Sequence, residues 1–216
     1  MRQSCKTMRN NIKLAMETGF EVIGENRPAG YSWYETARVQ THEFAAIWGI
    51  EPIVAALVLA GSSRACTVEE NFRRACEFLD TGTVGFAGDY CDDLLRRWGQ
   101  YGKIGSPKAH KVRAFTNNIL SGDSSVVTID RHAVSCAINH NVDTWTETTH
   151  KVVERQFLKV ADEVGMVPSQ VQSVAWIGWK YLKGYRPNPA KHHRCCFADF
   201  LPADYARDVY LASAVA

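Results

Sequence analysis

The chain has 216 residues, of which 46% are hydrophobic and 22% are charged, and its formal net charge is +2. This composition suits one globular unit or two tightly joined helical lobes, and it excludes a disordered or repetitive chain. The longest apolar run, residues 53–60, is far too short to span a bilayer, and the basic N-terminal segment lacks the apolar region of a signal peptide. We therefore expect a cytoplasmic protein without a membrane segment.

Predicted helices follow one another along the chain, because apolar residues recur at helical spacing and strand-like alternation is nearly absent. A first helix over residues 4–17 is expected to end at Gly19, and Ser32 is expected to cap a helix over residues 33–48. The other predicted helices cover residues 51–60, 67–79, 86–100, 108–120, 142–164, 168–182 and 202–212, with a short helix beginning at Asp130. We predict an all-α fold in which residues 1–216 form a single helical unit.

Local signals place several of the helix ends. Thr67 followed by Glu70 has the spacing of a capping box, and Ser169 stands near the start of the helix over 168–182. Residues 102–107 contain two glycines and a proline, which predicts a turn between two helices. Residues 126–129 are all β-branched, which predicts an extended segment just before Asp130.

The seven cysteines are an odd number without regular spacing, which favours reduced thiols over a disulfide framework. Cys195 and Cys196 stand beside His192 and His193. However, a zinc site needs a second ligand pair at suitable spacing, and an iron–sulfur loop needs four spaced cysteines. We therefore expect no metal and no cofactor.

The basic residues are segregated from the acidic ones. Residues 94–122 hold six Lys or Arg and no acid, and residues 165–197 hold five and no acid. These cations are Arg96, Arg97, Lys103, Lys108, Lys111 and Arg113 in the first stretch, and Lys180, Lys183, Arg186, Lys191 and Arg194 in the second. A single charge run is usually a solvated face, but two runs that are both interleaved with aromatic residues favour a polyanion partner.

Residues 103–132 combine two features that DNA chemistry needs close together. A turn between helices followed by a helix N-terminus presents backbone N–H groups and a positive dipole end to a phosphate, whatever the base sequence. The loop beyond the second helix then carries one carboxylate, Asp130. A single carboxylate stabilises the oxocarbenium-like sugar that forms as an N-glycosidic bond breaks, or it activates water against that sugar.

This stretch resembles the helix-hairpin-helix motif and aspartate-bearing loop of DNA glycosylases related to endonuclease III and MutY. Residues 127–132, Val-Thr-Ile-Asp-Arg-His, match the family's apolar segment, which places the catalytic aspartate at Asp130. Lys111 lies eleven residues before Gly122, where bifunctional members carry their Schiff-base lysine. Residues 59–71 resemble the segment that wedges into DNA where the base has left.

The likeness covers about residues 52–131. A weaker similarity links Gln172 and Trp176 to a Gln-x-x-x-Trp feature of uncharacterised phage-associated proteins. The hairpin departs from the family in the insertion of Ser106 and Pro107, and Arg131 replaces the usual threonine.

The resemblance implies a helix-hairpin-helix DNA glycosylase-like, two-lobed helical bundle, with residues 101–132 as hairpin and catalytic-loop region. Such a protein flips a damaged or modified base, including a phage-modified one, out of double-stranded DNA and excises it as a monomer, without an obligatory protein partner. Asp130 is the implied catalytic carboxylate, and Lys111 adds a possible lyase step. The implied DNA contacts are Gly102, Lys103, Gly105, Ser106, Lys108, Arg113, Ser62, Ser63, Arg64 and Arg131.

Each of these roles has an ordinary structural alternative. Asp130 at a helix start is also a common N-cap, and Asp123 is the second choice for the carboxylate. Lys111 is explained slightly better as a phosphate contact or a solvated lysine, because a Schiff-base lysine must lose its proton. Asn71 buttresses the pocket or is simply a polar helix residue, and His132 is more often a packed side chain than a proton carrier.

Trp176 and Trp179 lie three residues apart on one predicted helix and are expected to fill the core rather than stack on bases. Two rival functions also remain open. One is a transferase on the same fold that decorates bases of hypermodified phage DNA, and the other is a DNA-binding module without catalysis.

Overall fold

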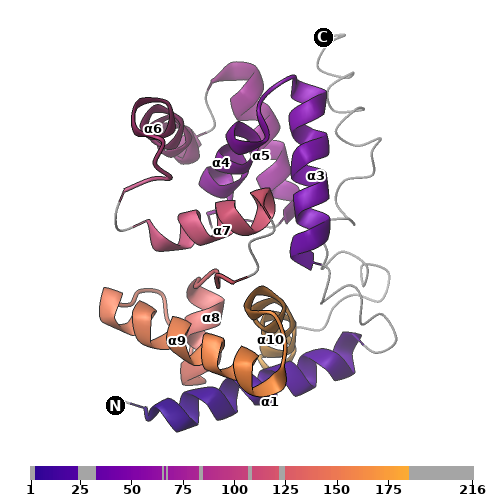
Figure 1. Ribbon diagram of the computed structural model, residues 1–216, viewed down its shortest axis with the longest axis vertical. Coiled ribbons are helices and arrows are strands. Elements are labelled where there is room, and N and C mark those ends of the chain that lie inside the picture. Colours follow the sequence, from indigo (N-terminus) through magenta and orange to yellow (C-terminus); the bar gives the residue numbers. More distant parts are fainter. Residues whose placement is uncertain are drawn as a thin grey trace. The chain divides into compact units, whose positions relative to one another are not determined.

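In the computed structural model, residues 3–23, 33–64, 66, 68–82, 85–106, 109–121 and 125–184 are described, and their regular structure is entirely helical (Figure 1). The helices are α1 (Cys5–Ile23), α3 (Trp33–Trp48), α4 (Pro52–Ser62), α5 (Val68–Thr81), α6 (Gly85–Tyr101), α7 (His110–Leu120), α8 (Arg131–Ile138), α9 (Glu147–Val164) and α10 (Pro168–Leu182). The predicted all-α class is confirmed for this part of the chain. The expected caps Ser32 and Thr67, and the expected helix over residues 202–212, lie outside the described residues.

The helices divide into two compact units. The first unit comprises α1, Trp33 and Tyr34, and helices α8, α9 and α10, and the second comprises the rest of α3 with α4 through α7. The region 101–132 contributes to both units, because its hairpin belongs to the second and Asp130 to the first.

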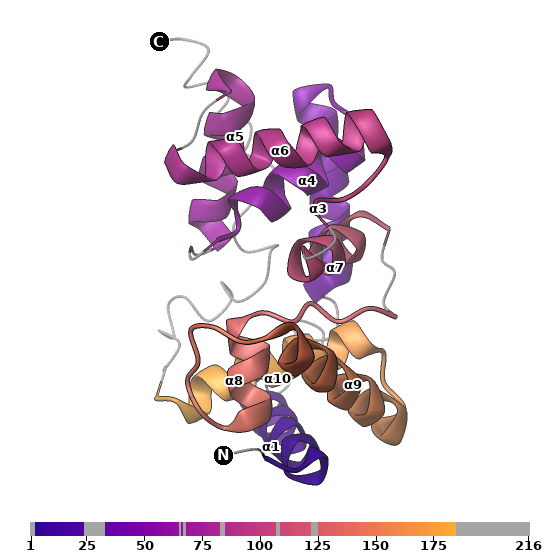
Figure 2. The same cartoon turned by 90° about the vertical axis from the view of Figure 1, so that its left-hand side faces the viewer.

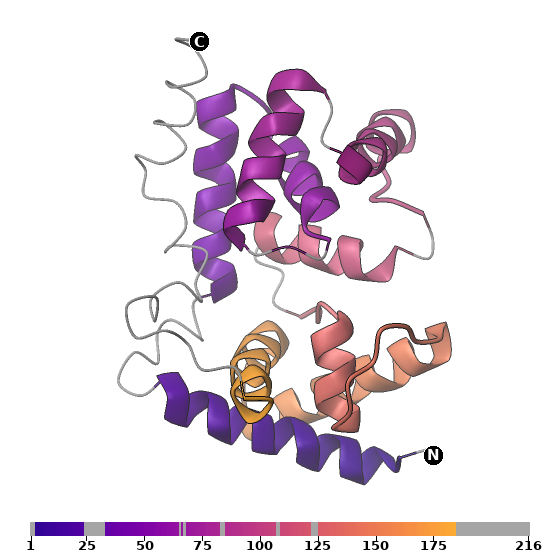
Figure 3. The ribbon, with the colours of Figure 1, turned by 180° about the vertical axis from the view of Figure 1, so that it is seen from behind.

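The first unit is built around the contact between α1 and α10 (Figure 3). Its core contains the apolar faces of α1, α8, α9 and α10, including the fully buried Ile12 and Phe157. Two glycines bring the backbones of α1 and α10 together: a Cβ on Gly178 would overlap the Ala15 carbonyl oxygen, and one on Gly19 would overlap that of Val174. The prediction that Gly19 ends the first helix is therefore wrong, since this glycine is a packing residue inside α1.

The start of α9 also differs from the prediction. The helix begins at Glu147, not at residue 142, because the Thr146 side chain caps it by accepting a hydrogen bond from Thr149 N at 3.2 Å. Val142 instead donates its backbone N–H to Ser135 Oγ at 3.1 Å, which holds residue 142 in the connection after α8. The bounds of α10 match the prediction. The N-cap residue is Val167, however, and Ser169 is a buried residue inside the first turn of the helix.

The second unit surrounds α4, whose residues 55–62 are buried against α5, α6 and α7 (Figure 2). Phe44 of α3 and Phe72 of α5 meet edge to face in this core, with ring centroids 5.9 Å apart. None of the described helices is by itself long and apolar enough to cross a membrane, and α3 with α4 reaches that length and composition only as a pair bent by 111°.

The described cysteines, Cys5, Cys66, Cys76, Cys91 and Cys136, are all free thiols. Burial raises the pKa of the Cys91 thiol to about 12, so this thiol stays neutral and unreactive at physiological pH. The Cys195–Cys196 pair that prompted the metal hypothesis lies outside the described residues.

Candidate functional site

The turn between α6 and α7 depends on two glycines with left-handed backbone angles. Gly102 has φ +60° and ends α6 by donating its N–H to Trp98 O at 2.8 Å. Gly105 has φ +64°, and a Cβ there would lie 2.8 Å from Ala109 Cβ and 3.2 Å from Leu94 Cδ2. A larger residue at Gly105 is therefore strained by its backbone conformation and crowded by two side chains, so glycine fits the close approach of this turn to the start of α7.

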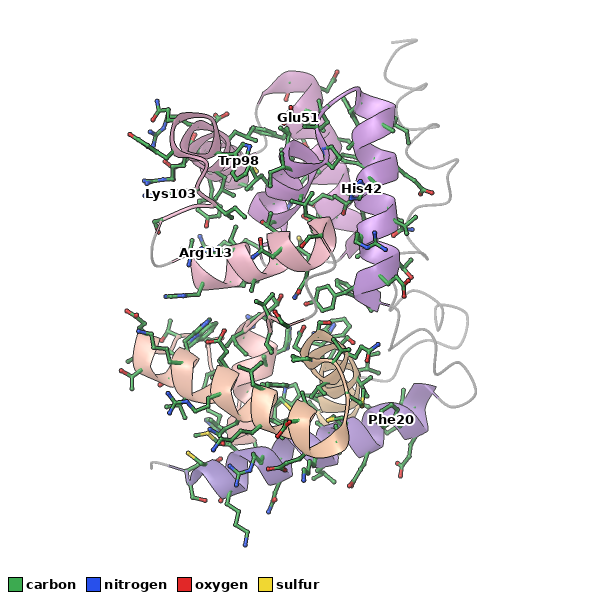
Figure 4. All side chains as sticks on the ribbon, viewed as in Figure 1. Phe20, His42, Glu51, Trp98, Lys103 and Arg113 are labelled. Carbon is green, nitrogen blue, oxygen red and sulfur yellow. The ribbon has the colours of Figure 1, made fainter. Side chains whose placement is uncertain are left out.

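The start of α7 carries cations where a helix ordinarily carries acids or a capping side chain. Its N-cap residue, Ala109, supplies no side-chain hydrogen bond, and the first turn contains no acid. Lys111 is the second residue of the helix, and Arg113 returns over the turn to donate from Nη2 to Ser106 O at 3.0 Å. Figure 4 shows Lys103, which belongs to this turn, and Arg113 of α7 at the same end of the second unit. Lys108 lies outside the described residues.

Of the cations in residues 94–122, those on α6 are paired with a carboxylate, whereas the described ones at the hairpin are not. Arg96 and Arg97 of α6 bind the Asp93 carboxylate at 2.5 and 2.6 Å, and the hydrogen bond from Arg97 is the main cause of the lowered Asp93 pKa. Lys103 and Arg113 form no ion pair with a carboxylate of the described residues. The net positive charge of residues 94–122 is therefore concentrated at the turn and the first turn of α7.

The end of α4 and the two residues after it carry three of the predicted DNA contacts, of which Ser62 is buried and Ser63 and Arg64 are more accessible. Ser62 has no exposed surface, and its hydroxyl lies 2.8 Å from Val58 O and 2.7 Å from Asn71 Oδ1. The prediction that Ser62 contacts DNA is incompatible with this burial, because Ser62 is the last residue of α4 rather than part of an exposed turn. Ser63 is half-buried and Arg64 is exposed, so these two residues are the accessible ones among the three predicted contacts.

Replacing Ser62 by Ala is expected to lower stability and leave DNA affinity unchanged. The variant removes one partner from the buried Asn71 side chain, and an unsatisfied buried polar group costs about 1–3 kcal/mol. Urea unfolding measures the loss, and duplex binding below the transition tests the second half of the expectation. Ser63→Ala, at the less buried neighbouring serine, is the matched control for stability, and a Ser62→Ala variant with native stability would contradict the structural role.

Arg74 of α5 holds the exposed part of this segment. Its Nη1 donates to Arg64 O at 3.0 Å, and its Nε pairs with the Glu70 carboxylate at 2.8 Å. Desolvation raises the pKa of the Cys66 thiol, while the positive charges of Arg74 and Lys111 lower it. Lys111 at the start of α7 therefore lies within electrostatic range of the segment after α4, so the second unit brings hairpin and predicted wedge together.

Asp130 follows an extended, buried segment and caps α8 in the first unit. Residues 127–129 are buried, and the half-buried Asp130 accepts a hydrogen bond on Oδ1 from Ala133 N at 2.8 Å. Among the described residues, no side chain or backbone group binds the other carboxylate oxygen. The cap fixes the carboxylate at the start of α8 with one oxygen still available.

The surroundings of Asp130 combine a buried thiol with a partly exposed aromatic cluster. Burial, assisted by the negative charge of Asp130, raises the pKa of the Cys136 thiol to about 12. Arg131 is exposed, and its guanidinium reaches only 3.8 Å from the Asp143 carboxylate. His132 meets the ring of Trp176 edge-on, with centroids 6.4 Å apart.

The predicted site residues therefore fall into two groups. Lys103, Lys111 and Arg113 gather in the second unit with the segment after α4, whereas Asp130 and Arg131 belong to the first unit. Sequence reasoning overlooked Arg74 as the residue that holds Arg64, although its spacing of four residues from Glu70 was visible. It named Lys180 only as part of a basic stretch and overlooked its contact with Trp176, whose ring centroid lies 4.0 Å from Lys180 Nζ at the same helical spacing.

The chain belongs to a family described as a family of unknown function, DUF7178, whose model matches residues 4–183. The match includes all the described helices, from α1 to α10. No curated protein and no solved structure is significantly similar to the chain.

Proposed function

We propose that this protein is a DNA glycosylase that holds the phosphate backbone with the α6–α7 hairpin and breaks an N-glycosidic bond with the help of Asp130. The observation that carries the proposal is the start of α7, where Lys111 and Arg113 follow an N-cap without a capping side chain. The positive end of a helix dipole disfavours cations by about 0.3–1 kcal/mol each. A phosphate bound there offsets this cost and accepts hydrogen bonds from N–H groups of the first turn, which the Ala109 side chain does not cap.

Asp130 supports the catalytic part of the proposal. Its cap fixes the side chain, and its second oxygen has no partner among the described residues. A fixed carboxylate of this kind stabilises positive charge on a deoxyribose as the bond to the base breaks, or it activates water. Lys111, close to the cation Arg113 on the same helix turn, is the candidate for an additional lyase step through a Schiff base.

The test is abasic-site formation. The purified protein is incubated with plain, damaged and phage-modified duplexes, and alkali cleavage of the strands reveals abasic sites. Alkali-dependent cleavage of one substrate supports a glycosylase and identifies its base, while cleavage without alkali implicates Lys111. Duplex binding without an abasic site on any substrate would overturn the hydrolytic proposal, and mass analysis of the bases then reveals whether a group has been transferred to one of them.

A non-catalytic DNA-binding module is the second candidate, and the capping bond of Asp130 favours it. Because Oδ1 already serves Ala133 N, the residue has a structural role that needs no reaction. Salt-dependent duplex binding that survives replacement of Asp130, with no turnover by the wild type, supports this candidate.

Replacing Lys103 by Ala is expected to weaken duplex binding equally on all sequences and to reduce the slope of log K against log salt by about 0.9. Arg113→Ala is expected to have a similar effect, because both cations lie at the hairpin without a carboxylate partner among the described residues. Arg96→Ala is the matched control, since Asp93 already neutralises that side chain. Fluorescence anisotropy at several salt concentrations measures the slopes, and an unchanged slope in Lys103→Ala would contradict backbone binding by the hairpin.

A further inference from the structure

One face of α10 carries Gln172, Trp176 and Lys180 at intervals of four residues. Trp176 is partly exposed, unlike Trp179, which lies in the core with 3% of its surface exposed. Lys180 Nζ lies 4.0 Å from the Trp176 ring centroid, and His132 of α8 meets the ring edge-on. The Trp176 ring is therefore held by two neighbours while part of it remains accessible.

Gln172 provides a second and independent observation on this face. The side chain is 93% buried, since 7% of its surface is exposed, and its Oε1 accepts a hydrogen bond from Tyr34 Oη at 2.6 Å. The Tyr34 bond orients the amide group, and no described residue accepts a hydrogen bond from its nitrogen. This nitrogen is not one of the fully buried polar atoms that lack a partner, so it keeps access to solvent and is able to donate to a ligand acceptor beside Trp176.

The same face lies next to the candidate carboxylate. Helices α8 and α10 pack against each other, and His132, which contacts Trp176, is the second residue of the helix that Asp130 caps. A planar ligand on Trp176 is thus bordered by the start of α8, where the second oxygen of Asp130 has no partner among the described residues.

We propose that Gln172 and Trp176 form a nucleobase-binding surface, in which the Trp176 ring stacks on the base and the Gln172 amide donates to a carbonyl oxygen or ring nitrogen of that base. Stacking suits any base because every base has a π face, whereas the amide favours a base with an acceptor at that edge. This inference deepens the proposed glycosylase function by naming the residues that hold the extruded base, and it corrects the expectation that Trp176 only fills the core.

The experiment measures binding without turnover, so that its result is separate from glycosylase activity. The probes are a single-stranded oligonucleotide in which every residue is a tetrahydrofuran abasic analogue, and the same strand with one central 2-aminopurine. The wild type is expected to bind the base-containing strand about tenfold more tightly and to quench its fluorescence, as stacking on an aromatic ring does.

Trp176→Leu is expected to bind both strands equally and to lose the quenching. Trp145→Leu, the same change at a partly buried tryptophan of the same unit, is the matched control and is expected to retain the tenfold preference. If Trp176→Leu does not fold, Trp176→Phe is used instead, with an expected preference of about threefold, because its ring is smaller. Equal binding of both strands by the wild type, or a full preference in the folded Trp176 variant, would overturn the proposal.

Gln172 is tested with a central thymine and with difluorotoluene, which has the shape of thymine but lacks its carbonyl acceptors. The wild type is expected to prefer thymine by about fivefold, because bound difluorotoluene would cover the Gln172 amide without accepting its hydrogen bond. Gln172→Leu is expected to show no preference. If these preferences hold but no duplex yields abasic sites, base binding stands and hydrolysis fails. If abasic sites form while the preferences are absent, hydrolysis stands and this surface is not the base-binding site.

Discussion

Asp130→Asn is expected to lower the rate of abasic-site formation by about 10²- to 10⁴-fold while leaving the protein folded. Asn caps a helix as well as Asp does, so the bond to Ala133 N is retained and only the negative charge is lost. The substitution therefore separates catalysis from capping. Single-turnover kinetics on the substrate found in the duplex panel measure the rate, and urea unfolding measures the stability.

Two further variants complete this test. Asp130→Ala removes both cap and charge, and it is expected to lose the same activity together with about 0.5–2 kcal/mol of stability. Asp143→Asn removes an exposed carboxylate of the same unit and is expected to leave the rate unchanged. A fully active Asp130→Asn variant would reduce Asp130 to its capping role and turn attention to Asp123, the other carboxylate predicted near the hairpin.

Gly178→Ala is expected to produce the largest loss of stability among single methyl additions, about 3 kcal/mol or more. Its Cβ would overlap the Ala15 carbonyl oxygen, and backbone atoms cannot move aside as a flexible side chain does. Helices α1 and α10, which form the most extensive contact in the first unit, must then move apart. Overpacking of this kind costs about 1–3 kcal/mol of stability, occasionally more. Thermal and urea unfolding measure the change.

Gly99→Ala serves as the matched control, with the opposite sign. Gly99 is an exposed glycine inside α6, and a Cβ there would meet no atom within 4 Å. Ala is a better helix former than Gly, so this variant is expected to gain about 0.5–1 kcal/mol. A Gly178→Ala variant as stable as the wild type would show that α1 and α10 do not require close backbone contact.

The helices that are easiest to predict owe their ends to neighbouring residues. Pro168 begins α10, and Gly102 ends α6 with a left-handed φ, so local chemistry is enough in both places. Gly19 looked like a helix end because its partner, Val174, is far away in the chain and only the folded unit brings them together. The predicted start of α9 at residue 142 is wrong for a related reason, because the hydrogen bond from Val142 N to Ser135 Oγ depends on a residue of the preceding helix.

The candidate site shows the same division. The hairpin was predictable because its glycines and cations lie close together in the sequence. The pairing of Arg96 and Arg97 was not predicted, because their partner Asp93 lies one residue before the acid-free stretch. The burial of Ser62 was not predictable, because it depends on Asn71 in the next helix. The partners of Trp176 come from both its own helix and α8, so local sequence reveals only Lys180.

The pairing of α1 with α10 has a consequence for the order in which the chain folds. The first unit is assembled from two segments that are separated in the chain by the helices of the second, so α1 emerges from the ribosome long before its partner exists. The second unit, whose described helices are continuous along the chain, is able to form during synthesis. The apolar face of α1, with Ile12 at its centre, therefore has no part of its own unit to pack against until the chain beyond the second unit has been made, and it packs against α10 last of all.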